Sequence, residues 1–159
     1  MEGRRPLLLE VQALVAPTSL TQPRRSVKGL EAARVHQLIA VLERHAGVSF
    51  VGQDVFVSVV GGFRVREPGA DLAVALALAS SRVGEAATGV AAWGEVGLTG
   101  EVRSVGQGDH RREEVKRMGV TTVVAPGEGE VERISDAVGA AGLLVPTSLA
   151  SRRVVRVDF

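Results

Sequence analysis

The first candidates for chemistry in this sequence are seven cationic residues in two short segments. Arg24, Arg25 and Lys28 fall within five residues, where a helix over residues 27–46 is predicted to begin with Ser26 as its N-cap. A helix N-terminus presents free backbone N–H groups and the positive end of its dipole, so this arrangement indicates a phosphate contact. A solvated loop, or a contact to a neighbouring subunit, would account for the same residues.

The second segment is a charged helix predicted over residues 109–118. It carries the other four cations, Arg111, Arg112, Lys116 and Arg117. Glu113 and Glu114 interleave with them, which favours a solvated helix face and leaves phosphate contact as the second interpretation.

Most other kinds of chemistry are excluded by what the sequence lacks. Neither lysine lies in the G-x-x-x-x-G-K-[ST] pattern of a phosphate-binding loop, so no ATP chemistry is expected on this chain. The absence of cysteine excludes disulfides, thiolate zinc sites and a cysteine nucleophile. The three histidines lack the i, i+4 spacing of a helical metal pair. We therefore expect no metal and no cofactor on this chain.

Composition places the chain among ordinary soluble domains. Its 159 residues are 45% hydrophobic and 23% charged, with a formal net charge of +1. The longest apolar run, Leu72 to Ala79, has eight residues, whereas a membrane span needs about 20. No secretory signal opens the sequence. These features predict a cytoplasmic protein that does not cross a membrane.

The elements that must position the cations alternate irregularly, which predicts an α+β fold with a mixed sheet. Strands are predicted over residues 6–15, 55–60, 63–66, 90–96, 101–105 and 120–125. Helices are predicted over 27–46, through the apolar run after a cap at Asp71, over 109–118 and over 131–141. We divide the chain into a domain at 1–146 and a basic C-terminal tail at 147–159.

Four segments of the sequence together resemble one family. They are LVAPTSLTQPRRSVKG at 14–29, VSVVGG at 57–62, ADLA at 70–73 and GEVGLTGEV at 94–102. These segments resemble the C-terminal domain of the RadA (Sms) family of bacterial DNA repair and recombination proteins. That domain is similar to the proteolytic domain of Lon. The resemblance therefore implies a Lon protease-like fold, in which a mixed sheet and packed helices form two layers of the ribosomal-protein type.

The same resemblance bears on proteolysis, because the Lon family cuts peptides with a serine that a lysine activates. Gly69 falls at the serine position, or Ala70 if the register slips by one, and Asp109 falls at the lysine position. None of these residues supplies that nucleophile or that base. We therefore expect no catalytic residues and no peptidase activity on this chain.

The resemblance also implies a larger parent protein, a DNA-dependent ATPase that promotes branch migration of recombination intermediates as a homo-hexamer. ATP, magnesium and zinc would belong to its other domains. The expected partners are duplex or branched DNA, further copies of the chain and the RecA-like ATPase domain of the same protein.

We therefore expect a non-catalytic oligomerisation scaffold that also binds duplex DNA through the seven cations. The alternative is a protein-interaction scaffold that does not contact DNA, and a peptidase with an atypical site is the third hypothesis.

Overall fold

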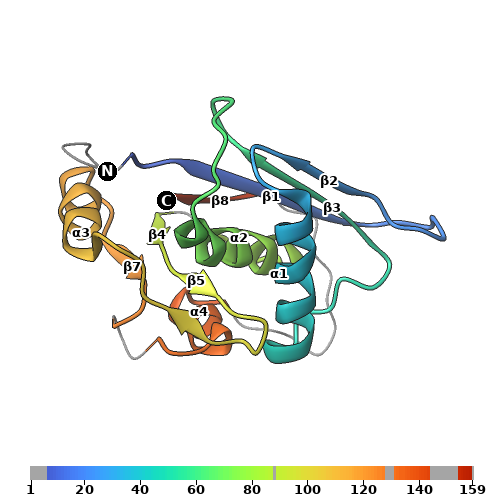
Figure 1. Ribbon diagram of the computed structural model, residues 1–159. Helices are drawn as coiled ribbons and strands as arrows, with labels where there is room; N and C mark the ends of the chain where they lie inside the picture. Colours follow the sequence, from blue (N-terminus) through green and yellow to red (C-terminus); the bar gives the residue numbers. More distant parts are fainter. Residues whose placement is uncertain (1–6, 88, 128–130, 144–153, 159) are drawn as a thin grey trace.

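The computed structural model describes residues 7–87, 89–127, 131–143 and 154–158, and it shows a mixed sheet with helices packed on it (Figure 1). The sheet has six strands in the order β2-β3-β1-β8-β4-β7. These are β1 (Glu10–Pro17), β2 (Arg25–Lys28), β3 (Gln53–Val59), β4 (Val90–Ala92), β7 (Thr122–Val124) and β8 (Val154–Asp158). Two short strands, β5 (Glu95–Val96) and β6 (Val102–Arg103), form a separate hairpin. This arrangement confirms the predicted α+β class.

Side chains alternate between two faces along the long strands. Val11, Ala13 and Val15 of β1 are buried, and the residues between them are only half-buried. β3 runs antiparallel beside β1 with the same alternation. We call the buried side the inner face, and the opposite side, which carries Leu14 and Phe56, the outer face. A period of two with one packed face is what an antiparallel pair produces when one side remains near solvent.

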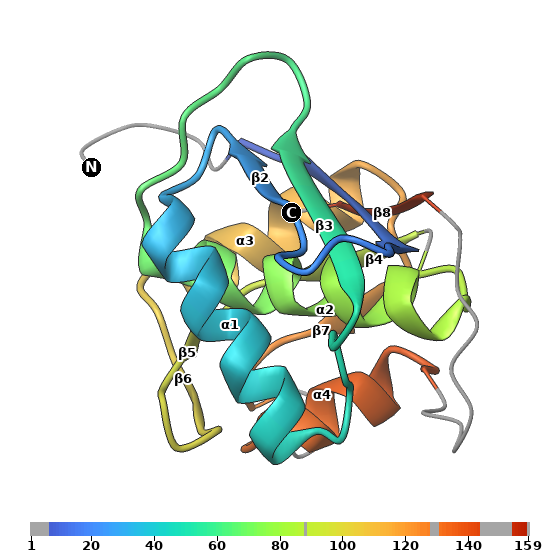
Figure 2. The ribbon, with the colours of Figure 1, turned by 90° about the vertical axis from the view of Figure 1, so that its right-hand side faces the viewer.

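Three helices lie on the inner face (Figures 1 and 2). Helix α2 (Asp71–Val83) packs against β1 and is buried along its whole length. Helices α1 (Ala32–His45) and α4 (Ile134–Ala140) pack on α2. A helix that is apolar on every side is stable only when other elements surround it, and α2 satisfies this condition.

The fourth helix, α3 (Gly108–Arg117), covers the outer face at the other end of the sheet. Ala91 and Trp93 belong to a small apolar cluster with Val115 of α3. Val90 and Ala92, which alternate with them, belong to the main core. The sheet is therefore covered on both faces around β4.

The first helix begins later than predicted, and Ser26 does not cap it. Residues 25–28 form β2, which pairs in parallel with β3, and the N-cap of α1 is Glu31, which makes no side-chain capping bond. Gly29 allows the turn between them: its φ is +80°, and a Cβ there would lie 2.5 Å from the Phe63 carbonyl oxygen. The predicted start of the helix was wrong because Val27, which fits helical spacing, lies in β2 and packs against the main core from there.

Two predicted strands also differ in the structure. Residues 63–66 form a loop, held to Gly29 by a hydrogen bond from the Val65 N–H to its carbonyl at 2.8 Å. The strand predicted over 90–96 is divided into β4 and β5 at Gly94, whose φ of +154° interrupts the ladder.

At the C-terminal end, β8 lies between β1 and β4, although its residues fall in the predicted tail. None of the helices that the structure describes is long and apolar enough to cross a membrane.

Candidate functional site

Arg24 is held by a carboxylate at the start of β2. Its guanidinium donates from Nε and Nη2 to Oδ2 of Asp54 at 3.0 and 2.7 Å, and its backbone N–H donates to Oδ1 at 2.7 Å. The Asp54 side chain is only 4% exposed, whereas that of Arg24 is 64% exposed. The guanidinium carbon also lies 5.8 Å from the centre of the Phe56 ring. Arg24 is therefore accessible, but its charge is already matched.

Arg25 and Lys28 lie on β2 and not at a helix N-terminus, so the predicted combination with the dipole of α1 is wrong. Nη1 of Arg25 donates to the carbonyl oxygen of Arg24 at 3.2 Å and to that of Gln53. Lys28 is exposed at the end of the strand. Of the three cations predicted here, only Lys28 has a side chain that the described structure leaves unpaired.

Two further cations, Arg64 and Arg66, lie close to Lys28 in the structure, and the sequence analysis did not select them as site residues. A hollow of about 540 Å³ is lined by Lys28, Arg64 and Arg66, and Glu31 is the only acidic residue in its wall. None of the three cations makes an ion pair within the part of the chain that the structure describes. We call this the basic hollow. In residues 63–66 the two arginines alternate with apolar residues, which is the pattern that could have indicated the basic hollow, but this alternation was interpreted as a strand.

Most of the cations of α3 are engaged with carboxylates. The pairs are Arg111 with Glu67, Arg112 with Asp109 at 3.3 Å, and Arg117 with Glu114 at 2.6 Å. The side chain of Arg111 is only 14% exposed. Lys116 is exposed and has no ion pair among the described residues. These contacts favour the solvated-face interpretation of α3.

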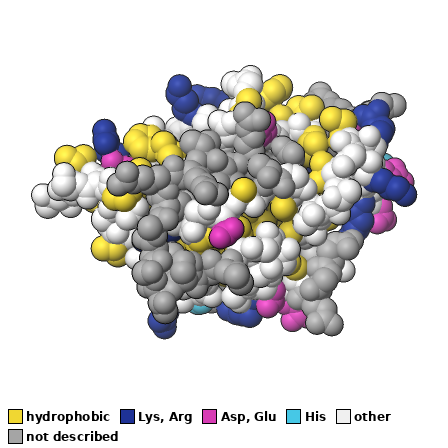
Figure 3. All heavy atoms as spheres, turned by 180° about the vertical axis from the view of Figure 1, so that it is seen from behind, with side chains coloured by type: hydrophobic (Ala, Val, Ile, Leu, Met, Phe, Trp, Pro, Cys, Tyr) yellow, Lys and Arg dark blue, Asp and Glu magenta, His cyan; other side chains and the backbone are white. Residues whose placement is uncertain are grey.

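The two cationic segments lie at opposite edges of the sheet. β2 forms one edge, α3 packs near β7 at the other, and four strands stand between these edges. At about 4.8 Å per strand, the two edges are roughly 24 Å apart. Figure 3 shows Lys and Arg side chains at separate places around the rim of the rear side and not as one patch. The structure therefore does not combine the seven predicted cations into one surface.

The two positions compared with the Lon serine and lysine differ in their surroundings. Gly69 is buried in a short 3-10 helix, Pro68–Ala70, and a Cβ there would lie 3.2 Å from the Val105 side chain and 3.4 Å from Nη2 of Arg111. The Asp109 side chain is 94% exposed. The space beside Gly69 is therefore filled by the side chains of Glu67, Val105 and Arg111. Among the residues that the structure describes, no three His, Asp or Glu side chains are grouped so that they could hold a metal ion.

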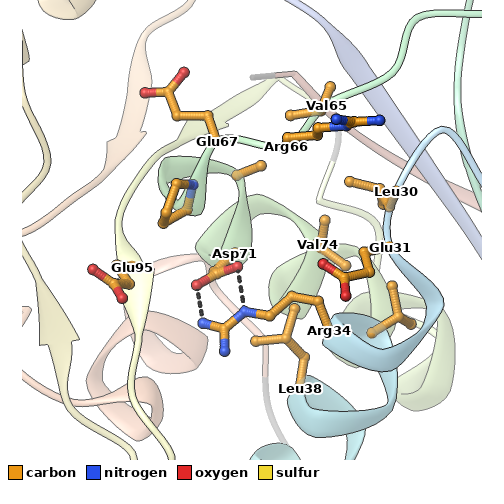
Figure 4. Close-up of a pocket in the computed structure, with 13 residues that line it drawn as sticks. Leu30, Glu31, Arg34, Leu38, Val65, Arg66, Glu67, Asp71, Val74 and Glu95 are labelled. Carbon is orange, nitrogen blue, oxygen red and sulfur yellow. Dashed lines mark hydrogen bonds and ion pairs between the residues drawn. The ribbon is translucent and has the colours of Figure 1, made fainter.

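A second hollow lies between the first half of α1 and the start of α2 (Figure 4). It measures about 290 Å³ and is lined by four carboxylates and two guanidinium groups. The carboxylates are those of Glu31, Glu67, Asp71 and Glu95, and the cations are Arg34 and Arg66. We call this the acidic hollow.

An ion pair between a half-buried arginine and a buried carboxylate forms the centre of the acidic hollow. Nε of Arg34 donates to Oδ1 of Asp71 at 2.9 Å, and Nη2 donates to Oδ2. The Val96 N–H donates to the same carboxylate at 3.0 Å. The hydrogen bond to Asp71 raises the pKa of Arg34 above its ordinary value. Sequence reasoning missed this pair because it assigned Asp71 to helix capping, whereas Asp71 makes no capping bond.

The Arg24–Asp54 pair predicts a loss of stability in acid. The hydrogen bonds from Arg24 lower the pKa of Asp54, so this carboxylate stabilises the fold above its unfolded pKa of about 3.9. That stabilisation is lost as the pH falls through the lower, folded pKa. We expect the urea midpoint of the wild type to fall more steeply below about pH 4 than that of Asp54→Asn.

The coupling between Arg24 and Asp54 can be tested in an Arg24→Gln background. There, Asp54→Asn should change the fall of the urea midpoint in acid much less than it does in the wild type. Parallel curves for wild type and Asp54→Asn would contradict the prediction.

The comparisons with known proteins point to one group of relatives. The chain is 47% identical to the DNA repair protein RadA of Brucella abortus over 133 residues, which are 82% of this chain and 28% of that protein. It is 47% identical to RadA of Aquifex aeolicus over 132 residues, 82% of this chain and 30% of the relative. For RadA of Escherichia coli the identity is 47% over 126 residues, 79% of this chain and 27% of the relative.

These matches confirm the resemblance to RadA seen in the sequence. The chain spans less than a third of the length of these relatives. No protein-family model matches the chain.

Proposed function

Because this chain is related to the RadA DNA repair proteins over about four fifths of its length, we propose that it is a non-catalytic domain that contacts duplex DNA. The basic hollow is the observation that carries this proposal. Lys28, Arg64 and Arg66 surround it, and only one carboxylate lies in its wall. Duplex DNA presents about one negative charge per 1.7 Å of axis, so three exposed cations in one hollow fit its phosphates.

The other predicted cations contribute less in this proposal. Arg24 already has a carboxylate partner, and Arg25 already donates to carbonyl oxygens. Lys116 and the paired arginines of α3 lie at the far edge of the sheet, and the contacts of these arginines favour a solvated helix face. Weak binding by one copy would increase on a ring of six, because linked sites raise the effective concentration.

The remaining parts of the proposal come from the resemblance. The domain would be Lon protease-like but without peptidase activity, since Gly69 and Asp109 offer no nucleophile and no lysine base. It would support the assembly of a cytoplasmic, hexameric DNA-dependent ATPase that promotes branch migration. ATP, magnesium and zinc would bind to other domains of that protein.

Replacement of the basic hollow's cations should weaken DNA binding and reduce its salt dependence. For Lys28→Gln/Arg64→Gln/Arg66→Gln we expect the magnitude of the slope of log K against log salt to fall by about 0.9 for each lost phosphate contact. The measurement is fluorescence anisotropy of a labelled duplex at several salt concentrations. Arg44→Gln removes an exposed charge from the last turn of α1 and serves as the control.

An unchanged slope in the triple variant would contradict the role of the basic hollow. If the wild-type chain does not bind DNA even at low salt, the alternative is a protein-interaction scaffold. The near-neutral net charge and the paired cations of α3 favour that alternative. Light scattering would then show self-association without DNA.

A further inference from the structure

Phe63 is an exposed aromatic residue in the loop beside the basic hollow. Four aromatic residues fall in the part of the chain that the structure describes. Phe50 and Trp93 are buried, Phe56 is half-buried, and Phe63 is 47% exposed. Figures 1 and 2 show the loop of residues 60–67 extending beyond the end of β3. Among the described aromatic side chains, the one that a ligand reaches most easily therefore lies on a projecting loop.

The backbone around Phe63 holds its ring in place. The Val65 N–H donates to the Gly29 carbonyl oxygen at 2.8 Å, which ties the loop to the end of β2. Gly61 has a φ of +89°, and a Cβ there would lie 2.9 and 3.1 Å from Cε2 and Cδ2 of the Phe63 ring. One edge of the ring thus rests on the Gly61 backbone. A ring that is positioned before binding loses little conformational freedom when a ligand arrives.

The charge beside Phe63 favours an anionic ligand. Arg64, the next residue, lines the basic hollow together with Arg66 and Lys28, and the wall contains a single acidic residue, Glu31. These three cations have no ion pair with any residue that the structure describes. A ligand that contacts both the ring and the hollow must therefore offer a flat apolar face next to negative charge. A nucleotide in a DNA strand offers both, a base beside a phosphate.

We propose that Phe63 stacks on an unpaired base of DNA whose phosphates lie in the basic hollow. This inference rests on the proposed function and adds to it the form of DNA that the domain prefers. An unpaired base presents a free ring face, whereas a paired base must first be separated from its neighbours before Phe63 can stack on it. The domain therefore binds a duplex that contains unpaired bases more tightly than a fully paired one.

The test compares two labelled DNAs of equal length, a fully paired duplex and one with a central run of mismatches, by fluorescence anisotropy at one salt concentration. We expect the wild-type chain to bind the mismatched DNA at least about fivefold more tightly, the low end of what stacking on one base contributes. Phe63→Ala should remove this preference and leave binding to the paired duplex unchanged. Phe63→Leu, which keeps an apolar side chain without a ring, should also lose the preference, and Phe63→Trp should keep it.

Val51→Ala is the matched control, because it removes a different apolar side chain, 80% exposed, from the turn that precedes β3. It should leave both affinities unchanged. NMR gives a direct measure of the contact. The ring signals of Phe63 should shift when the mismatched DNA is added, whereas those of the fully buried Phe50 should not. Since Phe63 is exposed, its substitution should leave the urea midpoint nearly unchanged.

Equal affinities of the wild type for the two DNAs, or a preference that persists in Phe63→Ala, would overturn this inference. The proposed function would still stand in that case if Lys28→Gln/Arg64→Gln/Arg66→Gln weakens binding to the paired duplex. A loss of self-association in Phe63→Ala, measured by light scattering without a change in DNA preference, would assign the ring to a protein contact and overturn the inference as well. If the wild type binds neither DNA, the proposed function and this inference both fail.

Discussion

Asp71→Ala is expected to lower the free energy of unfolding by about 3 kcal/mol, the lower end of the cost of breaking a buried ion pair, because the guanidinium left behind is partly exposed. The Asp71 side chain is only 5% exposed and satisfies both Arg34 and the Val96 N–H. Alanine would leave the guanidinium, which is 31% exposed, without its carboxylate, and would leave a buried N–H without an acceptor. Urea denaturation followed by circular dichroism measures the difference.

Asp109→Ala is the matched control, because Asp109 also lies in the first turn of a helix but its side chain is 94% exposed. A surface pair and a helix-end charge contribute about 1 kcal/mol or less. Asp71→Asn, which keeps an acceptor for Val96, should cost less than Asp71→Ala. Equal losses for the Asp71→Ala and Asp109→Ala variants would show that the Arg34–Asp71 pair contributes nothing specific.

The parts of the fold that were predicted correctly carry their signal in consecutive residues. Helix α2 follows from an apolar run with no polar side, because only a buried helix tolerates such a sequence. β1 and β3 follow from runs of apolar and β-branched residues that the structure pairs side by side. In each of these segments the local pattern and the tertiary environment favour the same structure.

The start of α1 was predicted wrongly because a tertiary contact, and not the local sequence pattern, determines where the helix begins. Val27 and Leu30 match helical spacing, but the backbone turns at Gly29, where the Phe63 carbonyl approaches from a loop more than thirty residues later. The same limit applies to the candidate site. Arg24 could be identified as an exposed cation, but its partner Asp54 comes close only through the parallel pairing of β2 with β3.

The basic and acidic hollows share wall residues, namely Leu30, Glu31, Val65 and Arg66. Residues 60–67, which connect β3 to the 3-10 helix, therefore contribute to both. Arg64 was missed as a site residue because the apolar and charged residues of this segment also fit a half-buried strand. A change in this loop should therefore affect the shape of both hollows.

Leu76→Ala tests helix α2, which contributes Asp71 and Val74 to the acidic hollow, and we expect it to cost about 2 to 5 kcal/mol in stability, as other buried leucine truncations do. Leu76 is fully buried in α2, which packs against β1, β8, α1 and α4. Leu98→Ala makes the same chemical change at a residue that is 65% exposed, where the expected effect is within about 0.5 kcal/mol. Thermal and urea unfolding measure both variants.

If Leu76→Ala also loosens α2, the NMR signals of Asp71 and Val74 should shift while those of Lys116 on α3 do not. That result would show that α2 positions the acidic hollow and that α3 is packed independently of it. A Leu76→Ala variant as stable as Leu98→Ala would mean that the core around α2 repacks at no cost. The position of the acidic hollow would then depend on another element.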